Sequence, residues 1–246
     1  RGKTDKGRAR PRNEDQFLIA NLNKSMMVEQ TSLQLDDQTQ LHGIFQGTLL
    51  LVADGMGGHR AGDVASRLAI ETVTSYALNT MPWFFRLDEQ NEDDLVAVLG
   101  EALVRCEQAI RRNQEGSSPK KMGTTVTMIY VLWPNAYLVH AGDSRAYLLR
   151  DGRLRQMSRD HTMAQRIAEQ TGVDEDALEG GKWSHALINA VGASGDPVEP
   201  DVTKIPLLHG DTLLLCSDGL SGMVDDARIE SILLMTPNAD HACSAL

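Results

Sequence analysis

The sequence of 246 residues has few aromatic side chains, at 4%, and fewer basic than acidic residues. Lys and Arg total 24 against 34 Asp and Glu, so the formal net charge is −10. A protein that binds nucleic acid in general needs a basic face to neutralise phosphates, and a platform for single strands needs aromatic side chains. We therefore expect no nucleic-acid partner.

Cysteine is also scarce, and long apolar runs are missing. Cys106, Cys216 and Cys243 are far apart, with no Cys-x-x-Cys pair and no Cys/His cluster at zinc spacing. This pattern argues against a disulfide framework and against a structural zinc site. No run approaches the roughly 18 apolar residues of a membrane span, and no signal peptide is visible. These features predict a cytoplasmic protein without a membrane span in this chain.

The apolar residues that are present predict strands and helices in alternation. Short apolar runs predict buried strands, and apolar side chains at helical spacing predict amphipathic helices. The expected strands are residues 48–53, 124–132, 136–142, 145–150 and 212–217. The expected helices are residues 63–79 and 92–114, with weaker ones near 162–171 and 227–235. Hairpin-linked strands beside long helices predict a sandwich of sheets with helices packed outside.

Two segments do not fit this pattern. Residues 171–184 are polar and glycine-rich, which predicts a loop or flap. Residues 21–46 form a long mixed insertion for which the sequence predicts no function.

Three of the expected strands are followed directly by an aspartate and then a small residue. The aspartates are Asp54, Asp143 and Asp218, and Glu14 and Asp15 form another acidic pair. Carboxylates gathered at one rim of a sheet repel one another, and a hard cation such as Mg²⁺ or Mn²⁺ offsets that repulsion. A single Asp-Gly is more often only a turn, whereas three at matching strand ends favour a metal site.

The glycine-rich segment of residues 55–62 (GMGGHRAG) follows a strand and opens a helix, which is also the context of a dinucleotide-binding loop. The details disagree, because Arg60 occupies the position of the third glycine and Asp54 would repel a pyrophosphate. The chain has no G-x-x-x-x-G-K-[ST] phosphate loop. A nucleotide-binding domain is therefore the weaker alternative.

Three further residues suggest phosphate chemistry. Cys106 and Arg112 have the spacing of cysteine-based phosphatases, but Cys106 lies on the apolar stripe of an expected helix, which favours core packing. Arg10, beside the acidic pair, has the chemistry to hold a phosphate, or it is simply a solvated arginine. His59 has the chemistry of a general acid, or it belongs to the start of the helix.

Six motifs, in this order, resemble the metal-dependent Ser/Thr protein phosphatases (type 2C, PPM), and their bacterial branch in particular. They are RPRNED (10–15), ADGMGGH (53–59) with Ala61 and Gly62, GTT (123–125), AGDSRA (141–146), DH (160–161) and SDGL (217–220). The resemblance implies an α+β fold, a four-layer α/β/β/α sandwich of two antiparallel sheets flanked by helices. It covers nearly the whole chain, so we expect residues 1–246 to be a single phosphatase domain, cropped at both ends.

The resemblance also implies roles for individual residues. Asp54 would bridge two Mn²⁺ or Mg²⁺ ions, and the Gly55 carbonyl would contact one of them. Glu14, Asp15 and Asp218 would hold the second ion, directly or through water. Asp143 would support a third ion. Arg10 would bind the phosphate, and His59 would be the general acid.

Two positions depart from the family pattern. The family's late Asp-Asn motif, whose Asp binds the second metal, has no counterpart before Leu246, and Gly222 stands where the family often has Asp. The implied activity is hydrolysis of phosphoserine and phosphothreonine in phosphoproteins by a metal-activated water. The expected partners are phosphorylated proteins, a Ser/Thr kinase or its targets. The alternative is a catalytically impaired module of the same fold that binds phosphorylated partners.

Overall fold

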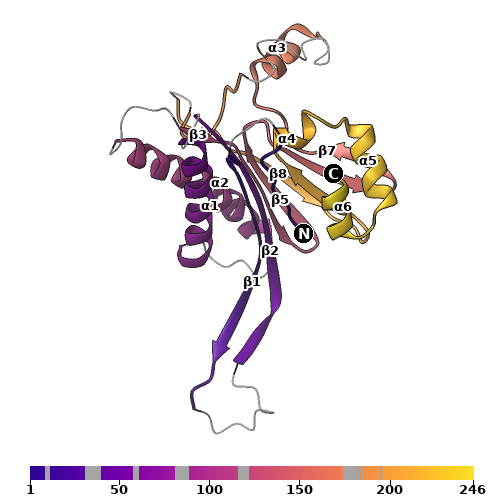
Figure 1. Cartoon of the computed structure of the whole chain (residues 1–246). Coiled ribbons are helices and arrows are strands. Elements are labelled where there is room, and N and C mark those ends of the chain that lie inside the picture. The colour runs from indigo at the N-terminus through magenta and orange to yellow at the C-terminus, as the bar shows by residue number, and fades with distance from the viewer. Residues whose placement is uncertain are drawn as a thin grey trace.

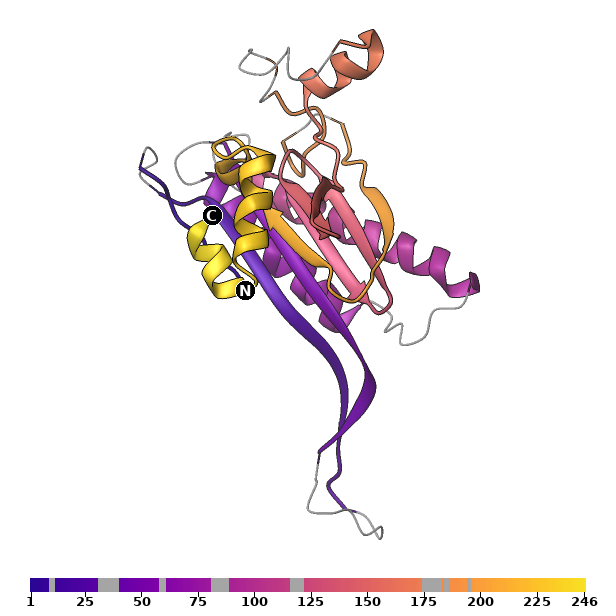
Figure 2. The same cartoon turned by 90° about the vertical axis from the view of Figure 1, so that its right-hand side faces the viewer.

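Two antiparallel β-sheets lie face to face in the computed structural model, and helices cover the outer face of each (Figures 1 and 2). The structure describes residues 1–8, 12–30, 40–57, 61–80, 89–115, 122–173, 183, 186–193 and 196–246. The predicted four-layer α/β/β/α sandwich is confirmed.

The larger sheet has the strand order β1-β2-β4-β5-β8, with β3 paired to the end of β2. Its strands are β1 (Asp15–Met27), β2 (Gln40–Met56), β3 (Gly123–Thr124), β4 (Val126–Leu132), β5 (Asn135–Ala141) and β8 (Asp201–Pro206). The smaller sheet has the order β7-β6-β9. Its strands are β6 (Arg145–Arg150), β7 (Arg153–Gln156) and β9 (Thr212–Cys216).

The central strands are almost wholly apolar because both of their faces are buried. Side chains alternate between the faces of a strand. In β4, Met128 and Tyr130 pack toward the helices, and Ile129 packs toward the smaller sheet. In β6, Leu148 lies between the sheets, and Leu149 packs against the C-terminal helices. This is why these runs have no polar alternation in the sequence.

Two long helices, α1 (Ala61–Asn79) and α2 (Glu89–Glu115), cover the larger sheet. Both extend the expected ranges by a few residues at their ends. The side of α1 that faces the sheet is lined largely by small residues, among them Gly62, Ala65, Ser66 and Ala69. Small side chains let α1 approach the strands closely, which places its N-terminus beside the end of β2.

The remaining helices are shorter. They are α3 (Met163–Thr171), α4 (Asp218–Ser221), α5 (Asp226–Met235) and α6 (Ala239–Ala245). Helix α3 begins after Thr162, whose hydroxyl accepts from the Gln165 N–H at 3.1 Å, and it stands away from both sheets (Figures 1 and 2). Helices α5 and α6 pack on the smaller sheet. The expected helices near 162–171 and 227–235 are confirmed, whereas most of the predicted flap lies outside the described residues.

Residues 21–27 and 40–46 of the long mixed insertion belong to the long hairpin of β1 and β2. Its outer part projects beyond the other strands as a two-stranded ribbon (Figures 1 and 2). The register shifts between Asn23 and Ser25, which marks an irregularity in the pairing. Polar residues interrupt the alternation in this segment, so strand β1 was missed.

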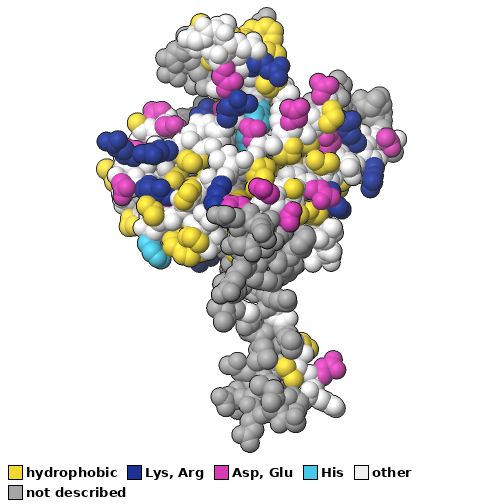
Figure 3. All heavy atoms as spheres, turned by 180° about the vertical axis from the view of Figure 1, so that it is seen from behind, with side chains coloured by type: hydrophobic (Ala, Val, Ile, Leu, Met, Phe, Trp, Pro, Cys, Tyr) yellow, Lys and Arg dark blue, Asp and Glu magenta, His cyan; other side chains and the backbone are white. Residues whose placement is uncertain are grey.

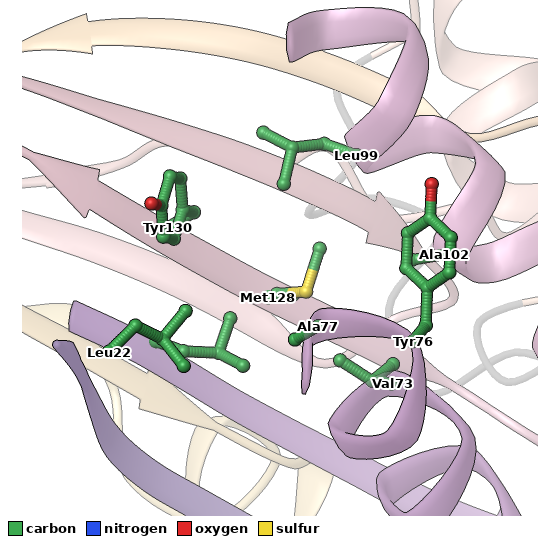
Figure 4. Close-up of a pocket in the computed structure, with 9 residues that line it drawn as sticks. Leu22, Val73, Tyr76, Ala77, Leu99, Ala102, Met128 and Tyr130 are labelled. Carbon is green, nitrogen blue, oxygen red and sulfur yellow. The ribbon is translucent and has the colours of Figure 1, made fainter. Parts of the chain in front are cut away.

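A small cavity lies between α1, α2 and the larger sheet (Figure 4). Its volume is about 10 Å³, and Val73, Leu99 and Met128 are among the residues that line it. This volume is at the lower limit for one water molecule, and such a water would need polar partners. We interpret the cavity as a packing gap.

The surface carries charges of both signs. On the face opposite to that of Figure 1, acidic and basic side chains are interspersed (Figure 3). The net charge of −10 is therefore not gathered on that face. Among the described helices, none combines the length and the apolar character needed to cross a membrane.

Candidate metal centre

Asp54 lies near the end of β2, directly opposite Asp15 at the start of β1. Paired residues of an antiparallel ladder project to the same side of the sheet with Cβ atoms about 5 Å apart. The backbone of Asp54 is fixed on both sides, since its N–H donates to Thr125 Oγ1 at 2.9 Å and its carbonyl accepts from Thr124 Oγ1 at 2.8 Å. The predicted pairing of Asp54 with the early acidic residues is therefore built into the strand register.

Asp218 reaches the same place from the smaller sheet. It is the first residue of α4, which begins directly after β9 and Ser217. The Ser217 hydroxyl donates to Asp15 Oδ2 at 2.7 Å, which joins the two sheets at this edge. Both Asp15 and Asp218 lie within hydrogen-bonding reach of the Asp54 carboxyl.

These carboxyl groups create an electrostatic imbalance. Burial and, to a smaller extent, the negative charges of Asp15 and Asp218 together raise the pKa of Asp54 to about 9. The side chain is 8% exposed. No Lys or Arg is found among the described residues that line the surrounding cleft. A bound divalent cation is the ordinary chemical answer to such a cluster.

The carboxyl groups open into a cleft of about 450 Å³. The cleft is lined partly by polar residues that the sequence analysis predicted for the site, and partly by residues with small or apolar side chains. The lining residues are Glu14, Asp54, Gly55, Met56, Gly57, Thr125, Asp143, Leu187, Ala190, Ala193 and Asp218. The cleft thus joins an acidic floor to an apolar wall, and its volume is sufficient for a small ligand.

The glycines of the predicted loop serve close packing. A Cβ on Gly55 would lie 2.1 Å from the Gly62 carbonyl oxygen, and a Cβ on Gly62 would lie 2.9 Å from Glu14 Oε2. The Glu14 carbonyl accepts from the Gly55 N–H at 3.2 Å and from the Ser66 hydroxyl at 2.6 Å. These contacts hold α1 against the strand ends and fix the backbone of Glu14, so the glycines are explained without a bound nucleotide.

The structure brings most of the predicted site residues together. Glu14, Asp54, Gly55, Asp143 and Asp218 line one cleft, and Asp15 lies beside Asp54. Arg10 and His59 lie outside the described residues, so their roles stay predictions.

Within the described part of the chain, no group of three or more His, Cys, Asp or Glu side chains is arranged to hold a metal as it stands. The chemistry of the donor set, three carboxyl groups around one buried position, nevertheless fits a divalent cation.

Cys106 has no part in this cleft. It is fully buried on α2, and burial raises the pKa of its thiol to about 12. A thiolate nucleophile needs a lowered pKa, so core packing is the role that the structure supports.

Sequence reasoning missed several residues that shape the site. Thr125 and Ser144 belong to recognised motifs but received no role, and Leu187, Ala190 and Ala193 were not singled out. Their contribution depends on tertiary contacts, for which the sequence carries no local signal.

Comparisons with known proteins agree with this geometry. The family model described as "Protein phosphatase 2C" matches residues 27–240. The Ser/Thr protein phosphatase PstP of Mycobacterium tuberculosis is 36% identical over 195 residues, which is 79% of this chain and 36% of PstP. The chain therefore spans about a third of that relative. The Ser/Thr phosphatase stp of Listeria innocua is 32% identical, over 78% of this chain and 75% of stp.

A solved structure matches as well. It is the catalytic domain of PstP in complex with two manganese ions, with 30% identity, a TM-score of 0.66, and coverage of 94% of this chain and 90% of that one. The relatives are named as phosphatases, which supports phosphatase function over the binding-module and nucleotide-binding alternatives. The chain belongs to the protein phosphatase 2C family.

Proposed function

We propose that the chain hydrolyses phosphoserine and phosphothreonine in phosphoproteins with the help of Mn²⁺ or Mg²⁺. The observation that carries the proposal is the meeting of Asp15, Asp54 and Asp218 at the acidic floor of the cleft, with the pKa of Asp54 raised to about 9. Family membership and the names of the relatives support the reaction class.

Six residues of the chain are proposed to hold the cations. Asp54 is the central ligand because it faces both Asp15 and Asp218. Glu14 and the Gly55 carbonyl are proposed on the side of α1, and Asp143 is proposed for a third ion. The manganese-bound PstP domain supports two ions. When bound, such ions supply Lewis-acid activation of a water nucleophile and offset the charge of the phosphate oxygens.

The remaining residues orient the substrate and limit the access of water. Met56, Leu187 and Ala190 form the apolar part of the cleft, which lowers the local dielectric around the phosphate. Arg10 is proposed to grip the phosphate and His59 to donate a proton to the leaving hydroxyl. The products are a Ser or Thr hydroxyl and inorganic phosphate, and no covalent phosphoenzyme is formed.

Two further proposals concern the partners and the compartment. A Ser/Thr kinase or its targets would supply the phosphorylated substrate, because only such enzymes make phosphoserine and phosphothreonine in proteins. The cytoplasm is proposed because the three cysteines are free.

The test is hydrolysis of a phosphothreonine peptide and of p-nitrophenyl phosphate with Mn²⁺, with Mg²⁺ and with EDTA. We expect turnover only with a cation, and loss of turnover in Asp54→Asn and Asp218→Asn. Asp93→Asn is the matched control, since Asp93 is exposed on α2. Turnover in EDTA, or full activity in Asp54→Asn, would refute the proposal.

A further inference from the structure

Three buried hydroxyl groups connect the backbone of Asp54 to the loop that carries Asp143. They belong to Thr125, Thr127 and Ser144, which are 1%, 0% and 0% exposed. Thr125 Oγ1 lies 2.7 Å from Ser144 Oγ, and the Thr127 hydroxyl donates to the Ser144 carbonyl at 3.0 Å. Ser144 is therefore held through both its side chain and its backbone.

The same Thr125 hydroxyl also contacts the backbone of Asp54. It accepts from the Asp54 N–H at 2.9 Å, and the Thr125 N–H donates to the Asp54 carbonyl at 2.9 Å. One side chain thus contacts the backbone of Asp54 and the residue that follows Asp143.

Gly142, the residue before Asp143, is also held in place. Gly142 has φ +122°, and a Cβ there would lie 2.5 Å from Thr125 Cβ. The Gly142 N–H donates to His161 Nδ1 at 3.3 Å, and the His161 N–H donates to the Gly142 carbonyl at 2.7 Å. Asp143 therefore sits between two anchored neighbours.

Thr127 is held in turn by a buried histidine. His140 is fully buried, its Nδ1 lies 3.0 Å from Thr127 Oγ1, and its Nε2 donates to the Arg159 carbonyl at 2.9 Å. Thr127 and His140 are also paired residues of β4 and β5. The hydroxyl groups of Thr125, Thr127 and Ser144 are thus connected to the central strands β4 and β5 of the larger sheet.

We propose that Thr125 and Ser144 are positioning residues that fix the separation of Asp54 and Asp143 before a cation binds. The proposal rests on the proposed function, because it takes both carboxylates as ligands. Carboxylates that share a site repel one another, so they need a support that does not depend on the cation. Groups that hold metal ligands in place commonly affect metal affinity by about 10–100-fold.

The experiment measures Mn²⁺ affinity by isothermal titration calorimetry and folding by thermal unfolding in EDTA. The variants are Thr125→Val, which removes only the hydroxyl, Thr125→Ser, which keeps it, Ser144→Ala, and the double variant Thr125→Val with Ser144→Ala. Thr74→Val is the matched control, because the Thr74 hydroxyl bonds only within α1, to the Ile70 carbonyl at 2.7 Å.

We expect Thr125→Val and Ser144→Ala to weaken Mn²⁺ binding by about 10–100-fold. Thr125→Ser and Thr74→Val should bind like the unmodified chain. The double variant should lose no more affinity than Thr125→Val alone, because the two hydroxyls act as a unit. A purely structural role would instead lower the unfolding temperature and leave the affinity of the folded protein unchanged.

Unchanged Mn²⁺ affinity in folded Ser144→Ala and Thr125→Val would overturn the proposal, as would equal losses in Thr125→Ser and Thr125→Val. If Thr125→Val does not fold, Ser144→Ala decides the question. If the proposed function itself is wrong, the result differs from all of these, because the unmodified chain would then show no Mn²⁺ binding that depends on Asp54.

Discussion

Replacing Asp54 with Asn should stabilise the cation-free protein while it abolishes cation binding. The pKa of Asp54 rises from 3.8 to about 9 on folding, through burial and the charges of Asp15 and Asp218. The folded state therefore keeps a proton that the unfolded state releases. Stability is unaffected below pH 3.8, falls as the pH rises toward about 9, and is level above it.

The size of this loss of stability follows from the shift in the pKa of Asp54. At 1.36 kcal/mol per pH unit, the cost at pH 8 reaches about 6 kcal/mol as an upper value. Water that enters the cleft screens the charges, so we expect about 2 kcal/mol. For a chain of this size, 2 kcal/mol corresponds to about 4–8 °C in the unfolding temperature. Asn is neutral at every pH and keeps the shape, so it takes up no proton on folding, and Asp54→Asn should unfold higher by that amount at pH 8 in EDTA and not at pH 4.

The assay is differential scanning calorimetry at pH 4, 6 and 8, in EDTA and in Mn²⁺, with Asp93→Asn as the exposed control. In Mn²⁺ at 100 times the Kd the unmodified chain should gain about 2.7 kcal/mol per site. Asp54→Asn should gain much less, so the order of stability reverses. If Asp54→Asn is no more stable than the unmodified chain in EDTA at pH 8, or its advantage does not change with pH, the electrostatic reasoning is wrong.

Three further predictions concern the buried side chains Asp160, Glu107 and Cys106. Asp160→Asn should lower the free energy of unfolding by about 3 kcal/mol, measured by urea denaturation, because it removes the partner of Arg145 in a largely buried ion pair at 2.8 Å. Glu169→Gln is the control. Because its ion pair with Arg159 is exposed, the free energy of unfolding should change by less than about 1 kcal/mol. Glu107→Gln should raise KM for a phosphopeptide more than it lowers kcat, since the buried Glu107 carboxylate accepts from the Val198 N–H at 2.7 Å, a few residues after the cleft-lining Ala193; an unchanged KM would contradict this. Activity should survive iodoacetamide, because burial raises the pKa of Cys106 to about 12, and mass spectrometry should find that thiol unmodified.

The sequence predicted most of the fold because its core elements carry strong local signals. The helices α1 and α2 have a continuous apolar stripe, and β4 and β5 are apolar on both faces. Strand β1 lacked such a signal, because it forms the edge of the sheet and then the exposed ribbon, where polar side chains are tolerated. Strand β8 was missed for a similar reason, since most of its residues are exposed or half-buried.

The candidate site was predictable only in part. Asp54, Asp143 and Asp218 could be found because each follows a recognisable strand or motif. The contact of Ser217 with Asp15 joins residues from opposite ends of the chain, and nothing in either segment indicates it. The same holds for Thr125 and Ser144, whose function in the structure depends on how the two sheets meet.

The register of β1 against β2 ties the ordinary core to the acidic cleft. Leu18 pairs with Leu51, and three positions along the same ladder Asp15 pairs with Asp54. A slip of one residue would turn the side chains of one strand to the other face of the sheet. Leu51 would then leave the cluster beneath α1 and α2, and Asp54 would point away from Asp218. Burial of Leu49 and Leu51, at 3% and 1% exposed, therefore helps to fix the position of Asp54. Apolar packing at a distance is thus what holds repelling carboxylates side by side.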